Sequence, residues 1–395
     1  MKRLSEFYDL MHATIPIRRD LVDFKLINVD KPSRVAALQK SYKRLEETPR
    51  DEQGRLLLED ERGRQVHIKA DYEQQELEKD LFFFKEGETA FGGYLSQLHP
   101  RFSEEVKELV DLLGSAAFEL FFTDRDGTVN NYCGRYRSSV QSAYNALFLT
   151  RFGRTVRQKP VILTSAPLKE TGIVDLTVIP EEIYLLAGSK GREYSDIHGE
   201  VRTYPIGRSD AERMKELNRR ISALLEEPEN RIFFEIGSSF QPKFGETTVA
   251  RQDVYGSVPQ EESERFKREV EAIVEELNGD ESRLRIEDTG KDLEIILASQ
   301  EAEAHFDKGD GLEFLVDELG LDLEKKEMLI CGDTSSDIPM VGKATELGAQ
   351  VTALFVTTDE GLRREVRDSS HRSHFVSNPD VLVTGLDLAS KENGV

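Results

Sequence analysis

Two apolar segments of this chain each run directly into a pair of aspartates. The segment AFELFFT leads into Asp124 and Asp126, and KEMLICG leads into Asp333 and Asp337. Carboxylates this close together, each pair following a strand, repel one another unless a cation lies among them. Mg²⁺ is a hard ion that prefers such oxygen ligands. The two pairs therefore predict a Mg²⁺ site and chemistry on an anionic substrate.

Two further polar positions also lie at the end of an apolar segment or at the start of a helix. Thr164 and Ser165 end the apolar segment VRQKPVILT, and Lys308 lies in FDKGDG, a loop that opens the helical stretch LEFLVDELG. The alternatives to a functional role are an ordinary strand threonine, with Ser165 serving instead, and a solvated surface lysine.

The elements that carry these residues indicate an α/β fold. Continuous apolar segments alternate with helical stretches, which is typical of a parallel sheet covered on both faces. In such sheets ligands bind beyond the carboxyl ends of the strands, so the polar residues should converge on one crevice. A charged middle portion interrupts the pattern. We expect helices at 210–227 and 261–279 there, and strands at 231–237 and 292–299.

The chain is expected to divide into four segments. They are an N-terminal module (1–115), a first core part (116–204), an inserted α+β cap (205–302) and a second core part (303–395). The N-terminal module has its own signals, since polar turn residues between β-prone runs predict a hairpin within 56–70. Helices are expected at 33–47, 71–84 and 102–113.

Composition narrows the partners. The 395 residues carry 53 basic and 75 acidic side chains, a net charge of −22, which should repel nucleic acid and anionic membranes. No apolar run approaches the length of a membrane span, and no secretory signal is evident at the start. The two cysteines, Cys133 and Cys331, fit a reducing cytoplasm, where we expect the protein to act.

Taken together, the motifs resemble the haloacid dehalogenase superfamily of phosphatases. Its pattern of DxDGT, Thr or Ser, Lys and GDxxxD occurs here in the same order, with an insertion where members with a C2-type cap have theirs. The resemblance implies a Rossmann-like core, with Asp124 as nucleophile and Asp126 as general acid and base. It implies Mg²⁺ among the Asp124 carboxylate, the Asp126 backbone carbonyl and Asp333, with Asp337 close by. Lys308 and Thr164 would hold the phosphoryl oxygens.

A narrower resemblance is to the trehalose-6-phosphate phosphatases, especially the nematode type. The segments FFTDRDGTVNNYCGRYRSSVQSAYNALFLTRF, VILTSAPLKETGIVDLT, LLAGSKGREY and LICGDTSSDIPMV carry it, whereas residues 1–100 do not obviously match. The resemblance implies hydrolysis of trehalose 6-phosphate through an aspartyl-phosphate. It also implies a set of sugar-binding residues, which are Lys190, Arg192 and Glu193 in one loop and Gln241 and Lys243 in the cap.

Two departures from the family pattern put the substrate in question. Arg125 and Lys190 replace aromatic residues and could alter how the sugar packs. One alternative keeps the chemistry with another sugar phosphate, of the glucosylglycerol or mannosylglycerate type. A second is a sensor that binds a sugar phosphate without turnover, although such a protein needs no paired nucleophile and acid. The N-terminal module is a candidate for binding a synthase partner or for forming a homo-oligomer.

Overall fold

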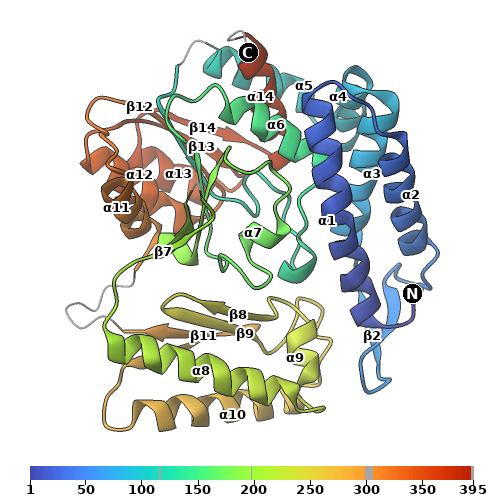
Figure 1. Ribbon diagram of the computed structural model, residues 1–395, viewed down its shortest axis with the longest axis vertical. Helices are drawn as coiled ribbons and strands as arrows, with labels where there is room; N and C mark the ends of the chain where they lie inside the picture. Colours follow the sequence, from blue (N-terminus) through green and yellow to red (C-terminus); the bar gives the residue numbers. More distant parts are fainter. Residues whose placement is uncertain (115–116, 197, 299–305, 393–395) are drawn as a thin grey trace.

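The computed structural model describes residues 1–114, 117–196, 198–298 and 306–392. A helical bundle at the N-terminus lies beside an α/β core and an inserted α+β cap (Figure 1). In the view of Figure 1 the bundle runs along one side of the molecule, from the core at the top to the cap at the bottom. Nowhere in the described ranges is a helix long and apolar enough to span a membrane.

The N-terminal bundle consists of helices and one hairpin. Its elements are α1 (Leu4–Leu26), α2 (Pro32–Glu46), β1 (Leu56–Glu59), β2 (Gln65–Ile68), α3 (Asp71–Glu86), α4 (Glu88–Leu98) and α5 (Phe102–Leu113). The hairpin and three of the helices occur where the sequence predicts them. Helix α1 was not expected, because Pro16 lies inside it and proline usually ends a helix.

The core is built on a sheet of eight strands. In sheet order they are β14 (Ser373–Val376), β13 (Gln350–Val356), β12 (Glu327–Gly332), β3 (Leu120–Thr123), β4 (Val161–Leu163), β5 (Leu185–Gly188), β6 (Glu193–Ser195) and β7 (Val201–Thr203). The pairs from β14 to β5 are parallel, and β6 and β7 are antiparallel additions. The predicted α/β class is therefore confirmed.

Helices cover both faces of this sheet. They are α6 (Ala143–Gly153), α7 (Ile173–Leu176), α11 (Lys308–Leu319), α12 (Ile338–Glu346), α13 (Glu360–Ser369) and α14 (Pro379–Glu392), with short 3₁₀ turns at Tyr136–Ser138, Ser189–Gly191 and Ser335–Asp337. Strand β3 shows why its sequence is wholly apolar. Phe121 packs into the core on the side of α5, α6 and α14, whereas Phe122 packs into a separate core on the side of α11 and α12.

The cap is an antiparallel sheet with two long helices on one face. Its elements are α8 (Arg208–Glu226), α9 (Arg231–Glu235), β8 (Phe240–Lys243), β9 (Glu246–Ala250), α10 (Gln260–Asn278), β10 (Leu284–Asp288) and β11 (Asp292–Leu297), with the sheet order β10-β11-β9-β8. Both long helices occur where the sequence predicts them. The charged outer faces of α8 and α10 account for much of the charge of the middle portion.

The strand expected at 231–237 is wrong, because these residues form helix α9 and the turn after it. Ile232, Phe233 and Ile236 are buried, a spacing that belongs to a helix face rather than to a strand. The ring of Phe233 stacks on Phe266 of α10 at 4.0 Å between centroids. Packing against α10 therefore decides the conformation of this short apolar run.

The four-part division of the chain stays a prediction. The expected boundaries at 115/116 and 302/303 lie outside the described residues. The boundary at 204/205 falls in the connection between β7 and α8.

One carboxyl at the meeting of bundle and cap should make stability depend on pH. Burial raises the pKa of Glu235 to about 7, above its ordinary value of 4.5, with Glu61 adding to the rise. Because the folded state prefers the neutral form, this group's contribution is present below pH 4.5 and lost as the pH rises through about 7. At pH 8 we expect Glu235→Gln to have a free energy of unfolding roughly 1–2 kcal/mol higher than that of the unmodified chain, measured by denaturant unfolding. At pH 4.5 we expect the two free energies to be equal.

Glu226→Gln, on an exposed position of α8, is the matched control and should leave both curves unchanged. Equal stabilities of the Glu235→Gln variant and the unmodified chain at pH 8 would contradict the assignment.

Candidate active site

Three carboxylates gather at the carboxyl edge of the core sheet. Asp124 follows β3 and Asp333 follows β12, and these two strands are neighbours, with the Asp124 N–H donating to the Cys331 carbonyl at 3.0 Å. Asp337 reaches the same place from the turn before α12. Ligand oxygens of Asp124, Asp333 and Asp337 all lie within 4.8 Å of one another. The sheet order thus brings together two motifs more than 200 residues apart.

A buried lysine lies against this group. Lys308 Nζ donates to Asp124 Oδ1 and to Asp337 Oδ1, each at 2.5 Å. Lys308 is the first residue of α11, whose start is capped by Asp307 through the N–H groups of Gly309 and Asp310. Lys308 is 3% exposed, so the surface-lysine alternative is wrong.

A glycine is required where the two motifs meet. Gly127 has φ +92°, and a Cβ atom built on it would lie 2.1 Å from Asp333 Oδ2. Thr128 Oγ1 donates to Asp333 Oδ1 at 2.9 Å from the next position. The Gly-Thr of DRDGT therefore lets the first turn approach Asp333 closely and holds that carboxylate by a hydrogen bond.

The charges of this group are not balanced. Burial, together with the nearby Asp124 and Asp337 carboxylates, raises the pKa of Asp333 to about 8 against the opposing effects of Thr128 and Lys308. Burial also raises the pKa of Asp124 to about 6 against the opposing effect of Lys308. Three oxygen ligands in need of positive charge are the donor set that a divalent cation such as Mg²⁺ fits.

Asp126 lies beside this group with its carboxylate turned to other partners. Its Oδ1 accepts hydrogen bonds from Arg125 Nη1 at 2.7 Å and from Ser139 Oγ at 2.7 Å. Arg125 is 1% exposed and also donates to Ser139. The arginine that replaces an aromatic residue therefore packs inside the protein, against Asp126 and Ser139.

The strand threonine has backbone contacts. Thr164 follows β4 and is buried, its Oγ1 accepting from the Ala166 N–H at 3.2 Å, while its carbonyl accepts from the Lys190 N–H at 2.9 Å. Ser165 is more exposed than Thr164. The choice between these hydroxyls as phosphate ligand stays a prediction.

A second charged cluster joins core and cap. Lys190, in the loop after β5, and Lys243, in β8, donate to the two oxygens of Glu246 at 2.9 and 2.8 Å. Gly311 of α11 has no room for a Cβ, which would lie 1.9 Å from the Lys190 carbonyl, so this loop packs tightly against the helix that begins with Lys308. Helix α11 therefore connects the two groups, since it packs against the Lys190 loop and begins with Lys308.

The remaining sugar-binding candidates have different hydrogen-bond partners. Arg192 Nη1 donates to the Phe244 carbonyl at 3.4 Å, and Glu193 Oε1 accepts from Ser189 Oγ at 2.6 Å. Gln241 instead donates to the Ser238 carbonyl within the cap at 2.9 Å. The structure thus brings Lys190 and Lys243 together at Glu246, and Gln241 lies two residues before Lys243 on the same buried face of β8.

Glu246 was not predicted from the sequence. Strands β8 and β9 went unpredicted because Pro242 and Gly245 look like strand breakers, yet β8 is an edge strand, where proline is tolerated. The signal that could have found Glu246 is an acidic residue three positions after Lys243 across a tight hairpin.

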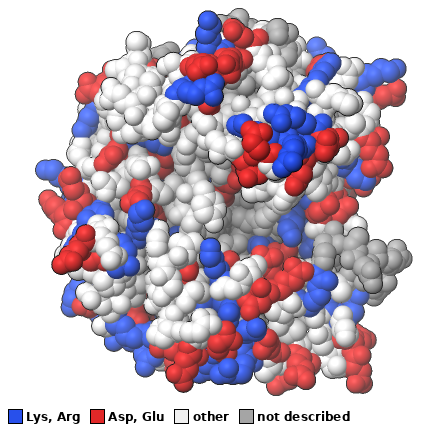
Figure 2. Space-filling model, turned by 180° about the vertical axis from the view of Figure 1, so that it is seen from behind, with Lys and Arg blue, Asp and Glu red and all other residues white. Residues whose placement is uncertain are grey.

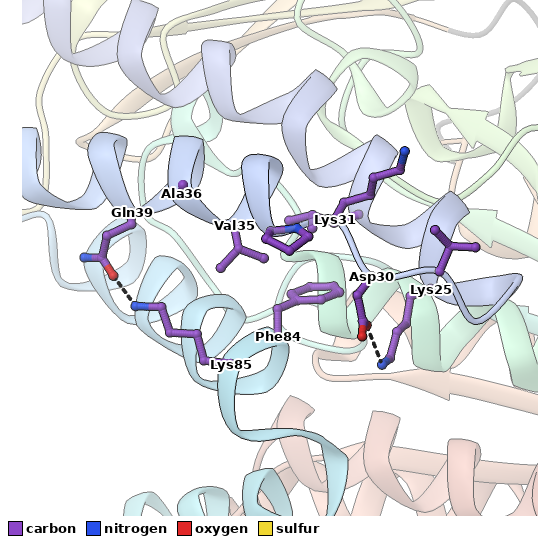
Figure 3. Close-up of a pocket in the computed structure, with 11 residues that line it drawn as sticks. Lys25, Asp30, Lys31, Val35, Ala36, Gln39, Phe84 and Lys85 are labelled. Carbon is purple, nitrogen blue, oxygen red and sulfur yellow. Dashed lines mark hydrogen bonds and ion pairs between the residues drawn. The ribbon is translucent and has the colours of Figure 1, made fainter.

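A separate pocket lies in the N-terminal bundle, far along the chain from these residues. It has a volume of about 480 Å³ between α1, α2 and α3, with Leu21, Val35 and Phe84 among its apolar lining residues and Lys31 and Lys85 at its edge (Figure 3). It contains none of the predicted catalytic residues.

On the face drawn in Figure 2, acidic and basic side chains are interspersed.

The core sheet carries an inserted cap, and Asp124, Lys308 and Asp333 meet at the carboxyl ends of its parallel strands. These features place the chain in the haloacid dehalogenase superfamily. Family models define it further. The model for the C-terminal part of trehalose-6-phosphate phosphatase matches residues 121–382, and that for the N-terminal helical bundle domain matches residues 3–102. The chain belongs to the trehalose-6-phosphate phosphatase family.

Proteins similar to this chain include some named as synthases and some named as phosphatases. An alpha,alpha-trehalose-phosphate synthase [UDP-forming] of Aphelenchoides avenae is 33% identical, the match covering 99% of this chain and 32% of that protein. A trehalose-phosphatase of Brugia malayi is 31% identical over 76% of this chain and 64% of its own length. The solved C-terminal domain of C. albicans trehalose-6-phosphate phosphatase is 14% identical, covers 72% of this chain and 96% of that one, and has a TM-score of 0.45. The chain thus spans about a third of the length of the first of these relatives.

The match over residues 3–102 corrects one expectation. Residues 1–100 were expected to fall outside the resemblance, because the hairpin at 56–70 suggested an unrelated module. The hairpin is a short excursion between α2 and α3, and the rest of the segment is helical.

Proposed function

We propose that this chain is a Mg²⁺-dependent phosphatase that hydrolyses trehalose 6-phosphate to trehalose and phosphate. The observation that carries the proposal is the contact of Lys308 with Asp124 beside Asp333, at the edge of the sheet. Family membership supports the choice of trehalose 6-phosphate among sugar phosphates. The cytoplasmic location and a synthase partner or homo-oligomer stay predictions.

The residues divide the reaction into two steps. Asp124 attacks phosphorus, so that a bond forms between its carboxylate oxygen and phosphorus while the bond from phosphorus to the sugar oxygen breaks. Asp126 gives its proton to that departing oxygen, and then removes a proton from the water that attacks the aspartyl-phosphate. Phosphate leaves and the Asp124 carboxylate is regenerated. Lys308 and Thr164 bind the phosphoryl oxygens, where charge accumulates in the transition state.

A cation completes this site. Asp124, Asp333 and the backbone carbonyl of Asp126 would hold Mg²⁺, with Asp337 fixing the turn through the N–H groups of Asp333 and Thr334. When bound, Mg²⁺ supplies positive charge that offsets the repulsion between an anionic nucleophile and an anionic phosphate. The raised pKa of Asp333 supports this assignment, because burial and two neighbouring carboxylates disfavour a negative charge that a cation would stabilise.

The sugar would lie between the phosphate site and the cluster of Lys190, Lys243 and Glu246. Burial would raise the pKa of Glu246, but Lys243 and Lys190 outweigh it and lower the pKa to about 2, so this carboxylate is ionised at neutral pH. Charged groups where core and cap meet can accept and donate the several directed hydrogen bonds that a disaccharide requires. Arg192, Glu193 and Gln241 are proposed as further contacts.

Glu246→Gln should therefore weaken substrate binding. We expect KM for trehalose 6-phosphate to rise by about tenfold with kcat within about threefold, because the lost group contacts the sugar rather than the phosphate. Glu276→Gln, on an exposed position of α10, controls for the loss of a cap carboxylate. An unchanged KM in the Glu246 variant would remove this cluster from the substrate site.

The substrate is tested by phosphate release from trehalose 6-phosphate, glucose 6-phosphate and glucosylglycerol phosphate, each with Mg²⁺ and with EDTA. We expect rapid release from trehalose 6-phosphate alone, abolished by EDTA and restored by added Mg²⁺. Release from another sugar phosphate would keep the chemistry and overturn the substrate. No release from any of them would favour a binding protein without turnover.

A further inference from the structure

Helix α3 of the N-terminal bundle buries polar side chains against the phosphatase core. Tyr72, Glu73, Glu76, Lys79 and Asp80 are all 9% exposed or less. Burying so many polar groups on one helix costs free energy unless each finds a partner. Asp80 pairs with Arg18 of α1, and Lys79 with Glu76 of the same helix. Their other partners lie on the core, in the segment that follows the DRDGT motif and in α6 and α14. The face of α3 is thus built to hold particular core residues.

Tyr72 makes the contact that leads toward the proposed general acid. Its hydroxyl donates to the Val140 carbonyl at 3.0 Å and accepts from Asn130 Nδ2 at 3.0 Å. The same Asn130 amide lies 3.4 Å from Asp126 Oδ1 as a donor. Asn130 is fully buried, and its amide also approaches the Asn131 carbonyl at 3.1 Å and Ser139 Oγ at 3.3 Å, so Tyr72 is one of several groups that fix its orientation.

Glu73 holds the other side of the same segment. It accepts from Ser138 Oγ at 2.6 Å and from Arg135 Nη2 at 3.1 Å. The residue after Ser138 is Ser139, whose hydroxyl donates to Asp126 Oδ1. Two adjacent residues of α3 therefore anchor, from both ends, the segment that supplies side-chain hydrogen bonds to Asp126 Oδ1.

These bonds leave Asp126 Oδ2 for the substrate. Among the described residues, the hydrogen bonds to the Asp126 carboxylate from Arg125, Ser139 and Asn130 all go to Oδ1. An acid that must deliver a proton to one oxygen of a sugar works best when its carboxyl group is held in a single orientation. A change in the orientation of Asn130 or Ser139 would rotate the carboxylate away from that oxygen.

We propose that Tyr72 is a positioning residue for Asp126, so that the N-terminal bundle contributes to proton transfer at the active site. The inference rests on the proposed phosphatase function, in which Asp126 protonates the leaving sugar. It gives the bundle a task in catalysis besides any binding of a partner.

The test compares leaving groups. Trehalose 6-phosphate releases an alkoxide that needs a proton, whereas p-nitrophenyl phosphate releases a phenolate that is stable without one. The measured quantity is kcat/KM, which covers the steps through phosphoryl transfer and excludes later water attack on the aspartyl-phosphate. We expect Tyr72→Phe to lower kcat/KM for trehalose 6-phosphate by about tenfold and to change that for p-nitrophenyl phosphate by less than about twofold.

Tyr42→Phe is the matched control, because that bundle hydroxyl donates to Glu78 and, among the described residues, shares no hydrogen-bond partner with Asp126. Loss of folded protein in the Tyr72 variant would lower both substrates equally and leave their ratio unchanged. An unchanged ratio therefore overturns the proposal.

A double-mutant cycle makes the same test independent of the aryl substrate. If Tyr72 acts through Asp126, then Tyr72→Phe lowers phosphate release from trehalose 6-phosphate in the unmodified chain and has no further effect in the Asp126→Asn background. Equal fold-losses in both backgrounds contradict it. Failure of the unmodified chain to hydrolyse trehalose 6-phosphate would overturn the proposed function itself, which is a distinguishable result.

Discussion

Asp124→Asn abolishes phosphate release from trehalose 6-phosphate, by about 10⁴-fold or more, because the amide oxygen is not a nucleophile toward phosphorus. The substitution keeps the shape of the side chain and removes one negative charge from a cluster in which burial raises the pKa of Asp333 to about 8. The variant should therefore fold at least as well as the unmodified chain. Activity is measured as phosphate release, and stability by thermal unfolding.

Asp317→Asn, on an exposed position of α11, is the control for loss of an aspartate elsewhere in the core. Its activity should match that of the unmodified chain. Residual activity of the Asp124 variant above about a hundredth would mean that another group attacks phosphorus.

Lys308→Ala has the second largest expected effect, and it acts on stability as well as on activity. The ammonium group contacts Asp124 and Asp337 at 2.5 Å each in a buried place. Its removal leaves buried carboxylates without a positive partner, a loss that costs about 3 kcal/mol of unfolding free energy. We also expect kcat to fall by about 10²-fold or more, because the phosphoryl oxygens lose a charged ligand.

The comparison variant is Lys343→Ala, in which a lysine of α12 loses ion pairs with Glu313 and Glu346 near the surface. It should change stability by less than about 1 kcal/mol. Denaturant unfolding without Mg²⁺ separates the two variants. Equal stability of Lys308→Ala and the unmodified chain would argue that Lys308 does not compensate these carboxylates.

The cluster of Asp124, Lys308 and Asp333 was predictable because each of these residues follows an apolar strand or opens a helix. Asp124 and Asp333 end neighbouring strands of a parallel sheet, and such ends converge whatever lies between them in the chain. The long helices of the cap were predictable for a similar reason, since their apolar spacing is a local signal. The roles of these residues in catalysis remain predictions.

Other features depend on contacts that the local sequence does not contain. Whether residues 231–235 form a helix or a strand depends on packing against Phe266 of α10. The junction at Glu246 joins a core loop to a hairpin more than 50 residues later. Arg125 was expected to affect how the sugar packs, but its side chain is buried against Asp126 and Ser139. A motif tells which residue is present and not toward which neighbour its side chain turns.

The most direct test of the whole account is to trap the aspartyl-phosphate. Excess enzyme is mixed with phosphate-labelled trehalose 6-phosphate and Mg²⁺, quenched with acid within the first turnover, and digested. The account predicts transient label on the peptide that contains Asp124, released by hydroxylamine and absent with EDTA or in Asp124→Asn. Rapid phosphate release with no label on Asp124 at any time in the turnover would contradict it.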